Sequence, residues 1–214
     1  MSKSGYHHGD LRNAMLDAAD QLLASQGLQG FTLRGCARLA GVSHAAPKHH
    51  FGDVRGLLSA VAARGFERLQ ATLKQAIEQV GEDLDAQMQA TTTAYVQFAQ
   101  DNPEHFRVMF RADLLRLPDG SGPPEPMRET FRVLTNVILS QRGEPLLQSS
   151  EVVNLVGFSL INDILIGWCH IHGFAHLLME GQLAMVPPGE LPQHIQRTSV
   201  RLAQAIRSHA LASR

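Results

Sequence analysis

Apolar residues recur at intervals of three and four along most of this chain, a spacing that places their side chains on one face of an α-helix. The clearest case begins at Asp53, a good N-cap, and continues to about residue 80 with the stripe Leu57, Leu58, Val61, Ala62, Phe66, Leu69, Leu73 and Ile77. Period-2 alternation is rare, and aromatic residues make up only 6% of the chain. We therefore expect an all-α protein of about nine helices.

The same spacing predicts further helices over residues 10–25, 32–40, 43–50, 88–100, 104–117, 127–141, 151–179 and 191–212. Asp10 and Thr32 are expected N-caps, and Gly27 and Gly41 are expected C-terminal stops. Glycine and proline separate the later helices, as in the run of residues 119–126. We expect a three-helix head over residues 1–53, a linking helix over 53–80 and a larger helical bundle over 81–214.

Composition favours a folded protein of the cytoplasm. Hydrophobic residues form 44% of the chain, which is ample for a core. The polar N-terminal segment lacks the apolar run of a signal peptide, and Cys36 and Cys169 form no metal-site or disulfide pattern. The long apolar stretch over 152–171 contains Asp163, so we interpret it as a buried helix and expect no membrane association.

The segment from Thr32 to Asp53 carries the strongest functional pattern. A helix, a tight turn at Gly41 and a second short helix together have the form of a helix-turn-helix. Ala37 and Ala40 are small enough to let the two helices cross closely. Helix pairs with small crossing residues also occur in ordinary bundles, so a purely structural role is the alternative at this point.

Charge and side-chain size favour DNA. The second helix is expected to begin at Ser43, whose hydroxyl and neighbouring N–H groups suit a phosphate, and its outward residues are small or basic: His44, Ala45, Lys48 and His49. Such a surface fits a major groove about 12 Å wide. Residues 1–68 contain eight Lys or Arg and five acids, a charge of +3, so the remaining residues carry −4 of the total of −1. No acid lies between residues 30 and 52.

Several motifs of this region occur in a familiar order. They are an N-terminal helix, Phe31-Thr32-Leu33-Arg34, Ala40-Gly41-Val42-Ser43 and His50-Phe51. Over about residues 6–65 the chain resembles the TetR family of bacterial transcriptional regulators. Further along, the segment 102–110 and Trp168 followed by His172-Gly173 resemble the C-terminal domain type named for its Trp-His-Gly signature.

This resemblance implies a homodimer that binds a near-palindromic double-stranded operator through two heads about 34 Å apart, and that responds to a small-molecule effector. It implies DNA contacts by Thr32, Arg34, Ser43, His44, Lys48, His49 and His50. The chain departs from the family at Lys48, where tyrosine is usual, and at Val54, where lysine is usual. Arg55 is expected to replace that lysine.

The effector pocket is expected in the bundle, lined by apolar side chains with a few polar groups. The candidates are Phe98, Phe106, Met109, Phe110, Phe131, Ile161, Trp168 and His172. Phe106, Met109 and Phe110, at helical spacing, also fit a plain core. Asn162 and Asp163 stand within an apolar helix, where an unpartnered polar group costs about 1–3 kcal/mol, so they are expected to face a ligand, a loop or the partner subunit.

The leading hypothesis is a ligand-responsive repressor, which is not an enzyme and carries no cofactor. No catalytic triad, Walker loop or dinucleotide fingerprint occurs in the sequence. The alternative is a helical metal-binding enzyme that uses His172 and His176, four residues apart, with Cys169 as a third ligand. The last helix, with Ile195, Val200, Leu202, Ala203 and Ile206, is expected to form a four-helix dimer interface with the helix of residues 151–179.

Overall fold

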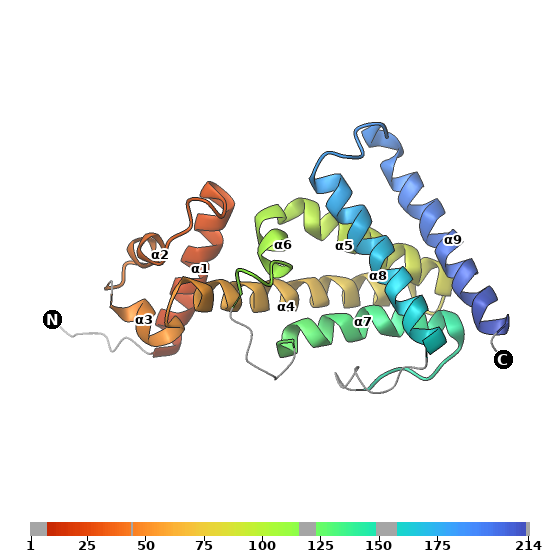
Figure 1. Cartoon of the computed structure of the whole chain (residues 1–214), viewed down its shortest axis with the longest axis horizontal. Helices are drawn as coiled ribbons and strands as arrows, with labels where there is room; N and C mark the ends of the chain where they lie inside the picture. The colour runs from red at the N-terminus through yellow and green to blue at the C-terminus, as the bar shows by residue number, and fades with distance from the viewer. Residues whose placement is uncertain (1–7, 44, 116–122, 149–157, 213–214) are drawn as a thin grey trace. The chain divides into compact units, whose positions relative to one another are not determined.

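The structure, a computed structural model, describes residues 8–43, 45–115, 123–148 and 158–212, and within them it contains helices and no strand. The expected all-α class is confirmed (Figure 1). The α-helices of the described residues are α1 His8–Gln26, α2 Leu33–Leu39, α3 Ala46–Phe51, α4 Val54–Val80, α5 Leu84–Asp101, α6 Pro103–Met109, α7 Glu125–Arg142, α8 Phe158–Met179 and α9 Leu191–Ala212.

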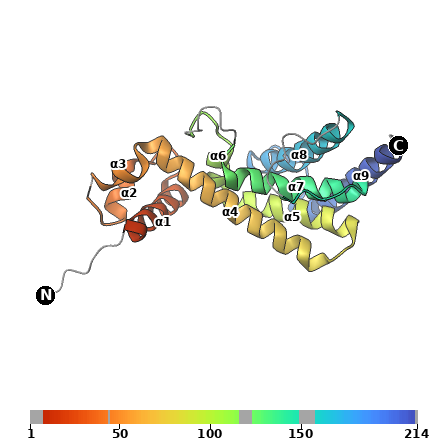
Figure 2. The ribbon, with the colours of Figure 1, turned by 90° about the horizontal axis from the view of Figure 1, so that it is seen from below.

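The chain divides into two compact units. The first comprises the described residues up to Gly65 and those from Asn102 to Pro124, and the second comprises Phe66–Asp101 and the described residues from Glu125 onward. Figure 2 shows α4 as one unbroken helix, whose residues up to Gly65 belong to the first unit and whose later residues belong to the second. The segment containing α6 therefore belongs to the compact unit of the head, whereas we expected it in the bundle domain.

Local sequence explains how the head folds. Gly27 ends α1 in the left-handed region at φ +64°, and its N–H donates to the carbonyl of Leu23 over 2.9 Å. The hydroxyl of Thr32 accepts the N–H of Gly35 over 3.0 Å, which confirms Thr32 as the N-cap of α2. Gly41 makes the predicted turn at φ +67°.

Two predicted helix starts in the head are wrong. Since α1 begins at His8, Asp10 lies inside the helix rather than at its cap. Since α3 begins at Ala46, with Ala45 as N-cap and no side-chain capping bond, Ser43 precedes the recognition helix instead of capping it. Pro47 explains the second shift, because proline lacks an N–H and is tolerated in the first turn of a helix, where no intrahelical bond is needed.

The second unit is a bundle in which α5 packs on α7, α8 and α9. One cluster of its core joins α5, α7 and α9 through Met88, Val137, Ile138, Ala203 and Ile206. At Gly167 of α8 an added Cβ would lie only 2.7 Å from Cδ1 of Ile138, so α8 and α7 approach closely there. The expected stripe of the 53–80 helix is buried from Leu57 to Leu73, and Asp53 caps this helix by accepting the N–H of Gly56 over 2.9 Å.

Two other predicted segments differ from the structure. The helix expected over 104–117 ends at Met109, because the residues after Phe110 form turns, with the N–H of Leu114 donating to the carbonyl of Arg111 over 2.9 Å. The helix expected from residue 151 is described only from Phe158, and its first residues lie outside the described part of the chain. No helix in the described residues has the length and apolar character needed to cross a membrane.

Candidate functional sites

The surface of α2 and α3 carries uncompensated positive charge. Arg34 and Arg38 on α2 and Lys48 on α3 are exposed, and within the described residues none of them forms an ion pair. Three of the acids of the head are used internally instead. Asp17 and Asp20 bind the guanidinium of Arg64 over 2.6 and 3.1 Å, and Asp53 caps α4. The cations of α2 and α3 are therefore available to a negatively charged partner.

The predicted DNA contacts are unequally placed on this surface. Lys48 and His49 are exposed on α3, whereas His50 is half-buried, with its ring centroid 6.3 Å from that of Phe51. Ser43 is exposed in the turn before α3, and His44 lies outside the described residues. The oxygen of Thr32 already accepts the N–H of Gly35, so its role at the helix end is first of all structural.

Arg55 has a partner within its own unit. Its guanidinium Nη2 donates to the carbonyl of Leu115 over 2.9 Å. A phosphate contact by Arg55 would have to compete with this bond. Arg12, which the sequence reasoning did not select, lies with its guanidinium carbon 5.8 Å from the ring centroid of Phe51, and its exposed side chain adds positive charge next to α3.

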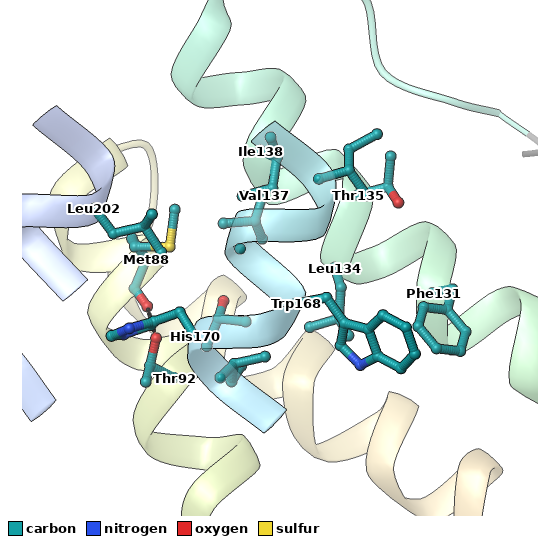
Figure 3. A pocket seen from close by; sticks show the side chains of 14 residues that line it. Met88, Thr92, Phe131, Leu134, Thr135, Val137, Ile138, Trp168, His170 and Leu202 are labelled. Atoms are coloured by element: carbon teal, nitrogen blue, oxygen red, sulfur yellow. Dashed lines mark hydrogen bonds between the residues drawn. The ribbon is translucent and has the colours of Figure 1, made fainter. Parts of the chain in front are cut away.

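The second unit contains a narrow cavity between α5, α7, α8 and α9, shown in Figure 3. Its volume is about 30 Å³, measured as the space open to the centre of a water-sized sphere. The lining consists of Met88, Thr91, Thr92, Phe131, Leu134, Thr135, Val137, Ile138, Ile164, Gly167, Trp168, His170, Ile171 and Leu202. The cavity has the apolar lining with a few polar groups that is typical of small-molecule sites.

Among the described residues, the cavity lining contains no Lys, Arg, Asp or Glu. The hydroxyls of Thr91 and Thr92 donate to carbonyls of their own helix, over 2.7 and 2.9 Å. In contrast, Nε2 of His170 is buried and has no hydrogen-bond partner among the described residues. Burial lowers the pKa of His170 and so favours its neutral imidazole.

The cavity includes only some of the predicted effector contacts. Phe131 and Trp168 line it, with their rings edge to face at a centroid distance of 4.9 Å. Ile161 is exposed, and Asn162 is half-buried outside the lining. The cavity is also not lined by Phe98, Phe106, Met109, Phe110, Asp163 and His172. His170 was missed by the sequence reasoning, because a single histidine in an apolar helix carries no distinctive spacing.

Phe106 and Met109 of α6 are core residues of the first unit, and Phe110 directly follows this helix and is half-buried. Phe106 and Met109 are almost fully buried, and the rings of Phe106 and Phe110 lie 4.8 Å apart. An added Cβ at Gly65 would lie only 2.6 Å from Sδ of Met109, which places α6 directly on α4 within this unit. Their helical spacing therefore reflects core packing, the alternative to an effector contact that the sequence had left open.

Asp163 is buried for a structural reason. Its carboxylate forms an ion pair with Arg142 of α7 and accepts a hydrogen bond from Nδ1 of His209 of α9 over 2.9 Å. These partners satisfy the carboxylate within its own chain. The burial of Asp163 is therefore explained without a contact to a ligand, a loop or the partner subunit, which were the three expected alternatives.

The geometry around His172 does not favour the metal-site alternative. Nδ1 of His172 lies 3.0 Å from the hydroxyl of Tyr95, and the rings of His172 and His176 stack at 6.3 Å. Burial, and secondarily the nearby His176, lower the pKa of His172, and burial raises the pKa of Tyr95. Within the part of the chain that the structure describes, no three His, Cys, Asp or Glu side chains are grouped to hold a metal ion.

Comparisons with known proteins agree with this architecture. Residues 88–202 match the family model of the tetracyclin repressor-like C-terminal domain, and residues 15–61 match that of the bacterial regulatory proteins of the tetR family. The Trp-His-Gly subtype of the C-terminal domain stays a prediction. No match was found among curated proteins.

Solved structures resemble nearly the full length of the chain. A protein of unknown function from Rhodococcus sp. RHA1 shares 30% identity, with a TM-score of 0.72 over 93% of this chain and 98% of that one. A TetR-family transcriptional regulator from Streptomyces coelicolor shares 14% identity, with a TM-score of 0.62 over 92% and 99%. A TetR variant from Acinetobacter baumannii AYE, solved with minocycline, shares 14% identity, with a TM-score of 0.59 over 95% and 97%.

The two family models together cover the head and most of the bundle, and the Rhodococcus protein extends the similarity over nearly the full length. The predicted DNA-binding regulator is confirmed at the level of the family. The chain belongs to the TetR family and is a ligand-responsive, DNA-binding transcriptional regulator.

Proposed function

We propose that this regulator is a homodimeric repressor that binds a near-palindromic operator and is released by a small-molecule effector. The observation that carries the proposal is the set of exposed cations on α2 and α3, which form no ion pair within the described residues. Phosphate neutralisation by such side chains supplies much of the affinity of a protein for DNA. The internal pairing of Asp17 and Asp20 with Arg64 supports the same function.

On the operator, α3 is the recognition helix. Lys48 and His49 are exposed and contact phosphates or base edges in the major groove, whose width suits a helix. Arg34 contacts a phosphate from the start of α2, and Ser43 contacts DNA from the turn before α3. The contact by His44 is proposed from the family resemblance alone, because this residue lies outside the described part of the chain. Thr32 holds the end of α2 in place through its capping bond. His50 and Arg55 contribute less directly, because His50 is half-buried and Arg55 binds the carbonyl of Leu115.

The dimer forms through α8. One face of this helix exposes the apolar side chains of Ile161, Leu165, Ile166 and Leu177, which a solvated helix rarely carries. Cys169 is also exposed, and the helical spacing places it at the centre of this face. The apolar residues of α9 contribute less than expected, because Ile195, Ala203 and Ile206 are buried within their own chain. A two-fold dimer presents both heads to operator half-sites about 34 Å apart.

Effector binding in the second unit releases the operator through α4. This helix contributes residues to both units, so a change in the bundle can reach the head along a continuous helix. The cavity is the site where the effector binds, and the effector stabilises the conformation in which the spacing of the two heads no longer fits the operator.

The test is binding to fluorescently labelled DNA that flanks the gene of this protein, measured by anisotropy at several salt concentrations. A repressor of this kind binds one segment at least about 1000-fold more tightly than unrelated DNA. One dimer binds each operator, with one subunit on each half-site. Affinity without sequence preference at any salt concentration would exclude an operator-binding function. A reporter gene placed behind the bound segment then distinguishes repression from activation.

A further inference from the structure

The cavity of the second unit restricts the chemistry of the effector, and this inference rests on the proposed function. The described part of the lining carries no charged group, and its apolar side chains come from α5, α7, α8 and α9. A carboxylate, phosphate or ammonium group that entered such a site would lose its hydration without gaining an opposite charge. The lining therefore selects against ionised ligands.

Size is the second restriction. About 30 Å³ of open space holds one or two water molecules, so even a small ligand enters only when side chains of the lining move. Met88, Leu134 and Leu202 are long and flexible enough to do so. At Gly167, in contrast, α8 and α7 already approach closely and leave no space. A compact ring fits these conditions better than a long or branched molecule.

The polar restriction comes from His170, one of two described lining residues with a buried nitrogen that has no hydrogen-bond partner; the other is Trp168, through Nε1. Figure 3 shows the side chain of His170 beside Met88 and Thr92, on the part of the lining away from Phe131. Its Nε2 is buried and has no hydrogen-bond partner among the described residues, and such an atom in a folded protein requires a water or a ligand. A neutral imidazole offers either a donor or an acceptor at this atom, so the matching ligand group is an uncharged amide, hydroxyl or carbonyl.

We propose that the effector is a compact, uncharged and mainly apolar molecule that carries one polar group bound by Nε2 of His170. The hydrogen bond orients the ligand, and burial of its apolar ring between the helices supplies most of the affinity. Within the class of small molecules, the structure thus points to neutral cyclic amides, alcohols or ketones rather than to organic acids or amines.

Trp168 provides the measurement, because it is the only tryptophan of the chain and lines the cavity. Three probes carry the same cyclohexyl ring and differ in the attached group: cyclohexanecarboxamide is neutral, cyclohexanecarboxylate is its isosteric anion, and cyclohexylmethylammonium is a cation with one heavy atom fewer. We expect the carboxamide to change the Trp168 emission with a Kd of about 10 mM or lower, as its few heavy atoms allow. The carboxylate and the ammonium are expected to bind at least about tenfold more weakly. Equal or tighter binding of a charged probe, or no response to the carboxamide, overturns the proposal.

Variants of His170 test the hydrogen bond. His170→Leu is expected to weaken carboxamide binding about fivefold, whereas His170→Gln, which retains hydrogen-bonding groups, keeps most of the affinity. His176→Leu is the matched control, because it makes the same substitution on an exposed residue of α8 outside the cavity. Equal effects of the two leucine variants, in proteins with unchanged circular dichroism, would remove His170 from the proposal.

The two titrations distinguish an incorrect ligand class from an incorrect repressor function. Protein that binds its operator but prefers charged probes retains the repressor function and loses only the assigned ligand class. Protein that binds the carboxamide at Trp168 but shows no operator retains the ligand class and loses the repressor function. The probe titration and the DNA titration are therefore run on the same preparation.

Discussion

Nε2 of His105 lies 2.9 Å from Oδ1 of Asp20, which joins α6 to α1 across 85 residues of sequence. The other oxygen of the same carboxylate accepts a hydrogen bond from Arg64 of α4 over 3.1 Å. All three side chains are largely shielded from water. One carboxylate thus joins three helices of the first unit, in addition to the packing of Met109 against Gly65.

Substitution of Asp20 tests this link. Asp20→Ala removes the acceptor of two shielded donors, so we expect the free energy of unfolding to fall by about 2 kcal/mol. Asp17→Ala is the control, because Asp17 binds the same Arg64 but its side chain is 65% exposed, and its loss should cost at most about 1 kcal/mol. Urea unfolding of both variants measures the difference. Equal losses would mean that the link through His105 contributes nothing to stability.

The proposed phosphate contact of Lys48 gives a quantitative prediction. Lys48→Ala is expected to weaken binding to operator and unrelated DNA alike, and to reduce the slope of log K against log salt by about 1. Lys74→Ala, an exposed lysine of α4 in the second unit, is the control for net charge and should leave the slope unchanged. Anisotropy titrations at four salt concentrations measure both slopes. An unchanged slope for Lys48→Ala would show that Lys48 binds no phosphate.

Periodicity and end signals predicted most of the fold. Thr32, Gly27 and Gly41 act locally, through bonds and dihedral angles within a few residues, and each has the role that we expected. The start of α3 was wrong because Ser43 and Pro47 give competing signals, and the proline prevailed. The early end of α6 depends on turns after Phe110 that apolar spacing does not reveal.

The candidate cavity was less predictable, because it depends on contacts between residues far apart in sequence. The burial of Asp163 is explained by Arg142 and His209, which are 21 and 46 residues away. His170 becomes a cavity residue only through the packing of α8 on α5 and α7. Phe131 and Trp168 were found because large aromatic residues in a helical bundle are frequent in both cores and pockets.

The proposed dimer interface predicts the behaviour of Leu165. Leu165 is 47% exposed on the apolar side of α8, so Leu165→Glu would place a charge inside the interface and yield monomers. Gln196→Glu, on the exposed polar side of α9, is the control and should leave the dimer intact. Light scattering after size-exclusion chromatography measures the mass. If Leu165→Glu formed dimers as tightly as the wild-type protein does, the dimer interface would have to lie on another surface.

Cys169 reports on the same interface. It is exposed at the centre of this face in the single chain, so a dimer formed through α8 should protect its thiol, and the monomeric Leu165→Glu variant should react quickly. The rate of reaction with a thiol reagent is measured in the Cys36→Ala background, where Cys169 is the only remaining cysteine. Equally fast labelling of wild-type dimers and of the variant would show that α8 faces solvent in the assembly.

Cys36 predicts a dependence of stability on alkaline pH. Burial raises the pKa of its thiol from 9.0 to about 11, so the folded protein holds the proton more tightly than the unfolded chain does. This contribution to stability is fully present below pH 9.0 and is lost as the pH rises through about 11. Wild type should therefore lose stability relative to Cys36→Ala as the pH rises from 9.0 to about 11, so the difference between their free energies of unfolding should become smaller. Urea unfolding at several pH values measures this difference. A difference that stays constant from pH 8 to 11 would show that the thiol ionises equally well in the folded and unfolded states.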